Sequence, residues 1–220
     1  RPIPAILHGF VYVGFLLINI EVMEILIDGI FGTHRVLSFL GGFYTAMIGF
    51  FEFLAFMVMI SCIIFLIRRN IVKVRRFLNP EMKGWPKADA NYILYMEIAF
   101  MVALLTMNGA DSALQKLGAE GYTQTGSFLI SGWLTEPLLS GLSESTLIII
   151  ERICWWFHIV GILFFLNYLY YSKHLHIILA FPNTYFSKLK PKGEFNNLES
   201  VTNEVKLMMD PNADPFAAPP

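Results

Sequence analysis

Four long apolar stretches alternate with polar segments along the chain. They run from about Ile3 or Ala5 to Phe31, from Gly41 to Leu66, from Asn91 to Asn108 and from Thr146 to Tyr171. About 20 apolar residues in a helix that rises about 1.5 Å per residue cross a hydrocarbon layer of about 30 Å. The pattern therefore predicts an all-α protein, an integral membrane bundle of four transmembrane helices.

The segment between the third and fourth stretches, residues 109–144, mixes Gly, Ser and Thr with moderate apolar runs such as SFLISGWL. Its glycines and Pro137 argue against a further crossing. We expect short helices that lie on, or dip into, the outer surface of the membrane.

Basic residues cluster on one side of the predicted bundle. The loop after the second span contains Arg68, Arg69, Lys73, Arg75, Arg76, Lys83 and Lys87, and the last span is followed by Lys173, Lys188, Lys190 and Lys192. Short cytoplasmic loops are enriched in Lys and Arg. The charges predict a multi-pass membrane protein whose C-terminus is cytoplasmic.

Hydrophobicity falls sharply after Pro182, and residues 188–220 are polar and end in MMDPNADPFAAPP. Proline and small residues favour an extended linker. We therefore predict a membrane domain at residues 1–187 and a cytoplasmic linker at residues 188–220. The start at Arg1, with neither Met nor a signal-peptide pattern, leads us to expect a longer parent protein.

Composition supports the membrane assignment and removes several alternatives. The 220 residues are 55% hydrophobic and 15% charged, and the mean hydropathy is +0.56, which is too apolar for a soluble domain. The net charge of −1 gives no indication of nucleic-acid binding. Cys62 and Cys154 both lie in apolar stretches, so the chain has no set of cysteines for a disulfide framework or an iron–sulfur cluster.

Histidines in the first and last stretches are the main candidates for cofactor ligands. His158 lies inside the last span, and at about 100° per residue His176 returns to its face whereas His174 points nearly opposite. His158 and His176 would be about 27 Å apart along this helix. This spacing suits two haems, one near each face of the membrane. Gly161, one turn after His158, would leave room for a flat ring.

Depth decides which histidines can pair. His8 begins the first span on the side where His176 ends the last one, so these two imidazoles could be the axial ligands of one haem b. His158 has no facing histidine on the first span. Met23 and His34 are the alternative partners for it, and an ordinary hydrogen-bonding role is the alternative for each single histidine.

Ionisable residues inside membrane spans are costly and are candidates for function. Here we predict proton handling for Glu21, Glu24, Glu52 and Glu97. Arg152 could neutralise one of these carboxylates, bind a haem propionate or snorkel outward. The alternative for Glu21, Glu24 and Asp28, which share a helix face, is an end wetted by lipid headgroups.

Two segments, RPIPAILHGFVYVGFLLINIEVMEI and above all SKHLHIILAFPNTYFSKLKPKGEF, resemble the membrane part of bacterial iron–sulfur oxidoreductases related to heterodisulfide reductase. The cytochrome part of that family is similar to the gamma subunit of respiratory nitrate reductase. The resemblance implies a helical bundle that binds b-type haem, exchanges electrons with a quinol and passes them to cytoplasmic 4Fe–4S clusters. It also implies a place in a bacterial inner membrane, a further span before Arg1 and an iron–sulfur domain after Pro220.

By position, the resemblance makes His8 and His176 ligands of the inner haem and His158 a ligand of the outer haem. The remaining family ligand would fall near Ile18 or Asn19, and neither can replace a histidine. One haem is therefore expected, and two are possible.

The leading hypothesis is a membrane electron-transfer module that links a quinone or quinol, through haem b, to a cytoplasmic iron–sulfur domain or subunit. The first alternative is a haem-free membrane anchor for an attached reductase. The second is a proton- or ion-coupled carrier, suggested by Glu52 and Glu97 and disfavoured by the lack of an internal repeat or broken helices.

Overall fold

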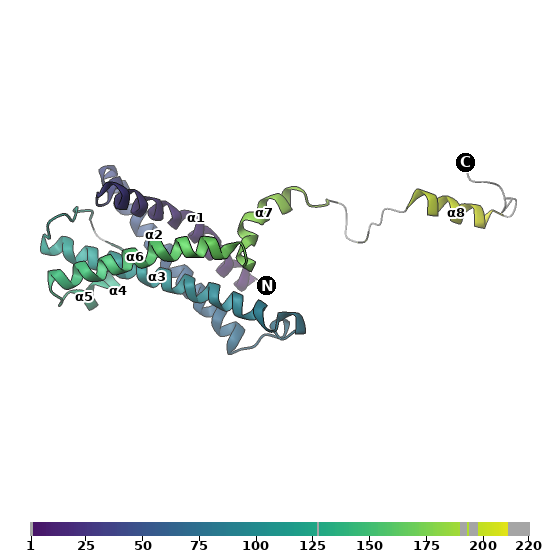
Figure 1. The fold of residues 1–220 in the computed structure, drawn as a ribbon, viewed down its shortest axis with the longest axis horizontal. Coiled ribbons are helices and arrows are strands. Elements are labelled where there is room, and N and C mark those ends of the chain that lie inside the picture. The colour runs from purple at the N-terminus through teal and green to yellow at the C-terminus, as the bar shows by residue number, and fades with distance from the viewer. Residues whose placement is uncertain (1, 127, 190–192, 194–197, 211–220) are drawn as a thin grey trace. The chain divides into compact units, whose positions relative to one another are not determined.

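Four long helices form the first of two units into which the chain divides, residues 1–176 and 177–220 (Figure 1). The computed structural model describes residues 2–126, 128–189, 193 and 198–210. The long helices are α1 (Pro2–Phe31), α2 (Gly42–Asn70), α3 (Trp85–Leu117) and α6 (Glu144–Leu169). Each is long and apolar enough to cross a membrane, which confirms the four predicted spans.

Helix α3 differs most from its predicted bounds, since it begins six residues before Asn91 and ends nine residues after Asn108. Hydropathy placed its end at the first strongly polar residues. In the structure Asn108, Asp111 and Gln115 are buried against other parts of the protein, so the helix continues through them without exposing them.

Short elements connect the long helices. A 3₁₀ turn, η1 (Val36–Leu40), joins α1 to α2, and the 3₁₀ turns η2 (Arg75–Phe77) and η3 (Pro80–Met82) join α2 to α3. Two one-turn helices, α4 (Ser131–Leu134) and α5 (Glu136–Leu139), lie in the segment predicted to contain short helices. Their place at the outer membrane surface stays a prediction.

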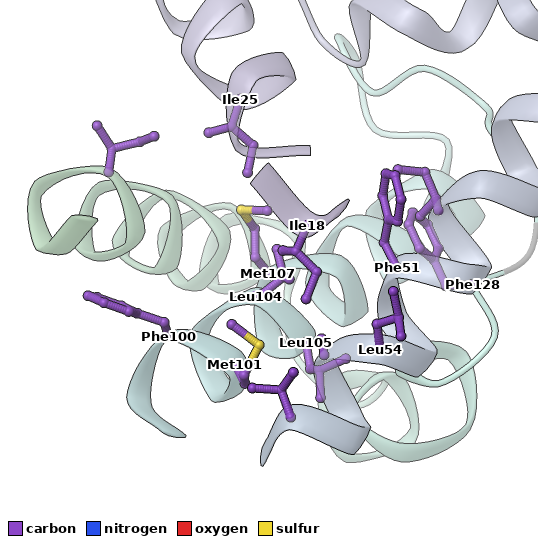
Figure 2. Packing of buried hydrophobic residues seen from close by; sticks show 14 of the residues in the cluster. Ile18, Ile25, Phe51, Leu54, Phe100, Met101, Leu104, Leu105, Met107 and Phe128 are labelled. Carbon is purple, nitrogen blue, oxygen red and sulfur yellow. The ribbon is translucent and has the colours of Figure 1, made fainter. Parts of the chain in front are cut away.

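Helix α3 is central in the bundle, because it packs along both α6 and α2, while α1 packs mainly on α2. Figure 2 shows the core at this junction, which includes Leu104 and Leu105 of α3 together with Ile18 of α1 and Leu54 of α2. Contacts between α1 and α6 are sparse. These two helices therefore flank a less tightly closed side of the bundle.

The last apolar stretch is not one continuous helix up to His176, contrary to the prediction. Helix α6 ends at Leu169, and a 3₁₀ turn, η4 (Lys173–Leu175), follows. The hydroxyl of Ser172 accepts a hydrogen bond from the His174 N–H at 3.1 Å, and the Asp89 carboxylate accepts one from the Lys173 N–H at 3.0 Å. These side chains give the backbone hydrogen-bond partners outside the helix, and the helix ends before His176. The prediction that His158 and His176 lie on one face of a continuous helix was therefore wrong.

The second unit contains two helices, α7 (His176–Tyr185), which starts at the last residue of the first unit, and α8 (Glu199–Met209). Helix α8 lies in the segment predicted to be an extended linker. The linker prediction relied on the prolines after Asp210 and overlooked ESVTNEVKLMM, which contains neither Gly nor Pro. Lys190, Lys192 and residues 211–220 lie outside the described residues.

Candidate functional site

His8 of α1 and His176 at the start of α7 lie together, with ring centroids 6.2 Å apart and ring planes at 61°. If each ring bound the same metal ion through one nitrogen, with the two metal–nitrogen bonds of about 2 Å in line, the ring centroids would be separated by these two bonds plus the two ring radii. That sum is close to the observed centroid separation. The two histidines therefore have the spacing of two axial ligands on one iron.

The other ring nitrogen of His176 is also suitably placed. Its Nδ1 lies 2.8 Å from the carbonyl oxygen of Lys173. Histidines that bind metals usually donate this second N–H to a carbonyl or carboxylate, which fixes the ring and leaves Nε2 free as the ligand. The break in the helix before η4 creates this contact.

The two rings line a cavity of about 290 Å³, called the histidine cavity below. Its walls are apolar and come mainly from α2, α3 and η2, and its cations are Arg68, Arg69 and Lys173. The Nε of Arg69 is buried and has no hydrogen-bond partner, and the guanidinium carbon lies 5.2 Å from the centroid of the Phe77 ring. Apolar walls with cations at one side suit a flat ring that carries carboxylates, so these residues fit a haem.

His174 is the third imidazole of the histidine cavity, 5.7 Å from His176 between ring centroids. It is buried, not directed to the opposite side as helical phase predicted. Burial, with smaller contributions from the neighbouring His176 and His8, lowers the pKa of His174 to about 4. His174 is therefore neutral at pH 7.

His158 of α6 is fully buried and lies away from the histidine cavity. It lines a second space of about 60 Å³, the central cavity, which is enclosed by residues of all four long helices. Its Nδ1 has no hydrogen-bond partner. The position expected for a facing ligand is occupied by Ile18 and Asn19, which line the same cavity.

Neither alternative partner for His158 meets it. Met23 is exposed, and His34 contacts Tyr122 and Asp111 at the other end of the bundle. The small central cavity and the lack of a facing ligand do not fit a second haem at His158.

Gly161 leaves room for a flat ring, as predicted, but the ring beside it is the side chain of Phe100. A Cβ at position 161 would overlap Cε1 of Phe100, whose ring centroid lies 5.7 Å from that of His158. The space predicted for a cofactor is filled by packing.

Glu97 of α3 lines the central cavity together with His158. Its Oε1 lies 4.0 Å from Nε2 of His174. Glu97 thus stands between the central cavity and the histidine cavity.

At the opposite end, a buried arginine that the sequence reasoning missed organises the polar residues. Arg35 donates to Asp111 Oδ2 through Nε at 2.9 Å and Nη2 at 2.8 Å, and to Asn108 Oδ1 at 2.7 Å. Its Nη1 lies 3.5 Å from Glu21 Oε1 and from the Tyr44 hydroxyl. We call Arg35, Asp111, Asn108, Glu21 and Tyr44 the Arg35 network.

Opposite charges hold Arg35 in its ionised form. Burial alone would lower the pKa of Arg35, but Asp111, Tyr44 and Glu21 raise it well above its ordinary value. No pattern in the sequence distinguished this arginine from an ordinary loop cation, because its network partners are 9 to 76 residues away.

The remaining predicted carboxylates have partners of their own. Glu24 accepts from the Tyr44 hydroxyl at 2.8 Å and from the Leu37 N–H at 2.9 Å. Glu52 accepts from the Ile130 N–H at 2.8 Å and from the N–H and hydroxyl of Ser131, so it anchors the start of α4. These contacts account for the burial of both side chains.

Arg152 does not reach the four predicted carboxylates through any ion pair that involves described residues. It pairs with its neighbour Glu151, Nε to Oε2 at 2.8 Å, and about half of its side chain is exposed. Arg35, not Arg152, is the cation that lies against Glu21.

Among the described residues, no group of three or more His, Cys, Asp or Glu side chains could hold a metal ion. A metal bound only by protein side chains is therefore not favoured there. A haem iron needs only two protein ligands, and the rings of His8 and His176 lie close together.

Two curated proteins resemble most of the chain. It is 27% identical over 201 residues to the probable iron-sulfur-binding oxidoreductase FadF of Bacillus subtilis, covering 91% of this chain and 26% of that protein. It is 24% identical over 221 residues to the EtfAB:quinone oxidoreductase of Syntrophomonas wolfei, covering 96% of this chain and 29% of that protein. The chain thus spans a little over a quarter of the length of these relatives.

No family profile matches the chain, and no solved structure matches it. The two relatives confirm the predicted relation to iron–sulfur oxidoreductases at a coarse level. The finer resemblance to heterodisulfide reductase and to the nitrate reductase gamma subunit stays a prediction.

Proposed function

We propose that this chain is the membrane part of a quinone-linked iron–sulfur oxidoreductase and binds one b-type haem through His8 and His176. The observation that carries the proposal is the 6.2 Å separation of the two imidazole rings across an apolar cavity. The relatives, one named as iron-sulfur-binding and one as a quinone oxidoreductase, support the reaction class.

The chain's own residues would hold the cofactor as follows. His8 and His176 would hold the haem iron, and the Lys173 carbonyl would fix the His176 ring through Nδ1. The apolar walls of the histidine cavity would pack against the ring, and Arg68, Arg69 and Lys173 would balance its negative charge. When bound, haem supplies a group that accepts and releases one electron at a time, at a potential set by its ligands and burial.

The partners are a quinone in the bilayer and an iron–sulfur domain or subunit on the side of the basic loop. Arg68, Arg69 and Lys173 line the histidine cavity, so the haem would lie near that end of the bundle. By the distribution of positive charge this end faces the cytoplasm of a bacterium, and the C-terminus lies there too. Two electrons and two protons are exchanged for each quinone that is reduced or each quinol that is oxidised.

The roles in proton handling predicted for Glu21, Glu24, Glu52, Glu97 and Arg152 remain proposals. Glu97 is the best placed of them, because it lines the central cavity and its carboxylate lies 4.0 Å from His174 of the histidine cavity. Glu24, Glu52 and Arg152 have hydrogen-bond or ion-pair partners that account for their positions, and Glu21 is partnered through Oε1 but not through Oε2.

The test is the haem content of the purified protein, measured by pyridine hemochrome analysis with His8→Leu and His176→Leu as variants. We expect one haem per chain in the wild type and loss of the bound haem in either variant, because each removes an axial ligand. His34→Leu is the matched control, since His34 lies in the Arg35 end of the bundle, and it should keep its haem.

Other outcomes separate the alternatives. A haem-free wild type that still assembles with a reductase would leave only the membrane anchor. Two haems per chain would contradict the single-haem assignment. Ion flux in proteoliposomes without a redox partner would favour the carrier.

A further inference from the structure

The unpartnered Nδ1 of His158 is the feature of the central cavity that the proposed function does not use. Buried polar atoms are nearly always hydrogen-bonded, so an exception needs an explanation. His158 is 1% exposed, and its Nδ1 has no partner. A ligand that brings one polar atom into an apolar space would satisfy it.

We propose that the central cavity binds the headgroup of a quinone, with His158 hydrogen-bonded to one quinone oxygen. This inference names the quinone site and therefore rests on the proposed function. It assigns to His158 a role other than ligation of a second haem.

The lining of the central cavity suits a quinone. Ligand sites are mostly apolar with a few convergent polar groups, and here Ile18, Val22, Met101 and Phe165 form apolar walls around His158. The volume of about 60 Å³ admits the carbonyl edge of a ring and not a porphyrin.

The quinone would enter from the lipid side. Phe15 and Asn19 of α1 and Ile162 of α6 line the cavity and are exposed or half-buried. The helices α1 and α6 make few contacts with each other. A ring can therefore enter edge-on between them, while its isoprenoid tail stays in the hydrocarbon.

A histidine is suited to both redox states of such a ligand. A neutral imidazole nitrogen can donate to the carbonyl oxygen of a quinone or accept from the hydroxyl of a quinol, depending on its tautomer. A lysine or arginine in the same place could only donate.

The central cavity is also connected to the proposed haem site through contacting rings. Ring centroids are separated by 5.7 Å from His158 to Phe100, 6.2 Å from Phe100 to Phe165 and 5.2 Å from Phe165 to His174. His174 in turn lies 5.7 Å from His176. The quinone site and the haem site are thus neighbours within one packed row.

The test measures the binding of a short-chain 1,4-naphthoquinone to the purified protein in lipid nanodiscs, by quenching of tryptophan fluorescence. We expect His158→Leu to weaken the Kd about tenfold or more, because one hydrogen bond to a buried group is lost. His158→Gln keeps a polar group and should recover part of the affinity. Asn167→Leu is the control, since Asn167 is an exposed polar residue of the same helix and does not line the cavity.

Haem content, measured on the same samples, distinguishes the two proposals. His158→Leu with weak quinone binding and unchanged haem supports the assignment. Wild-type affinity in His158→Leu overturns the quinone site and leaves the proposed function standing, whereas a wild type that binds no naphthoquinone removes both. A fall in haem from two to one in the variant would make His158 a haem ligand and overturn the inference.

If His158→Leu fails to fold, Ile18→Phe provides a second route. It fills the cavity from the opposite wall while His158 stays in place. Loss of naphthoquinone binding with haem retained supports the site, and unchanged binding overturns it.

Discussion

The two ends of the bundle differ in how completely their charged and polar side chains are hydrogen-bonded within the protein. At one end the Arg35 network is closed: Arg35 contacts two carboxylates, an amide and a hydroxyl, and Asp111 also lies 3.3 Å from His34 Nε2. At the other end, His8 and His176 face an open cavity, and Arg69 Nε has no partner. The first arrangement is satisfied except at Glu21 Oε2, which is buried without a hydrogen-bond partner, whereas the second lies beside a cavity that can take a ligand.

This difference shows why a charge inside a membrane span is an incomplete indicator of function. Burying an ion is unfavourable unless partners compensate for the lost water. Glu24 and Glu52 have such partners within the protein, so their burial needs no ligand to explain it. The histidines and Arg69 are better candidates because their hydrogen-bonding capacity is incomplete.

The largest predicted effect breaks the closed end. Arg35→Met leaves Asp111 and Glu21 buried without their cation, which should destabilise the protein by about 3–5 kcal/mol. Unfolding in mixed detergent micelles, followed by circular dichroism, measures the change. Adding Asp111→Asn to Arg35→Met should recover part of the loss, because it removes one uncompensated charge.

Arg152→Met is the matched control for this comparison. The Arg152 side chain is about half exposed and its partner Glu151 is buried. We therefore expect a loss of stability smaller than that of Arg35→Met and larger than the contribution of a fully exposed pair, which is about 1 kcal/mol or less. Equal losses of stability in Arg35→Met and Arg152→Met would contradict the view that the Arg35 network is the closed, buried centre of this end.

Sequence patterns were sufficient for the helices because hydrophobicity and helix length are local properties. The four spans follow from apolar runs, and the pairing of His8 with His176 followed from depth alone. The break after Leu169 could not be foreseen in the same way, since it depends on Asp89 of another helix accepting the Lys173 N–H.

The missed parts of the site share a physical reason. Arg35 sits in a short loop, where an arginine is ordinarily exposed, and only the fold brings Asn108 and Asp111 to it. Gly161 was correctly interpreted as space beside His158, but the sequence could not show that Phe100 of another helix fills that space. Long-range contacts decide both cases.

A smaller loss of stability is expected where a substitution fills space that another side chain already occupies, as beside Gly161. Gly161→Ala places a Cβ against the Phe100 ring, and such overpacking should destabilise the protein by about 1–3 kcal/mol. Gly9→Ala in α1 has no heavy atom within 4 Å of the added Cβ, so we expect no loss of stability. The same unfolding assay compares the two, and an equal response would show that Phe100 readily moves aside.

The smallest expected effect concerns the pH dependence of the closed end. Tyr122 donates its hydroxyl to Glu151 at 3.3 Å, and burial first, then the Glu151 charge, raises the pKa of Tyr122 above its ordinary value. Above a pH of about 10, the usual tyrosine pKa, the unfolded chain releases this proton while the folded chain keeps it. The folded state therefore loses stability as pH rises through this range.

Tyr122→Phe removes the titrating group, so its free energy of unfolding should fall less steeply than that of the wild type between about pH 9.5 and 11. Glu151→Gln keeps the phenol and removes only the neighbouring charge, so it should reduce the slope without abolishing it, because burial is the larger cause. Parallel profiles for the wild type and Tyr122→Phe would show that Tyr122 is hydrated in the folded protein. The closed end of the bundle would then stop at Asp111 and His34, and would not extend to the loop that contains Tyr122.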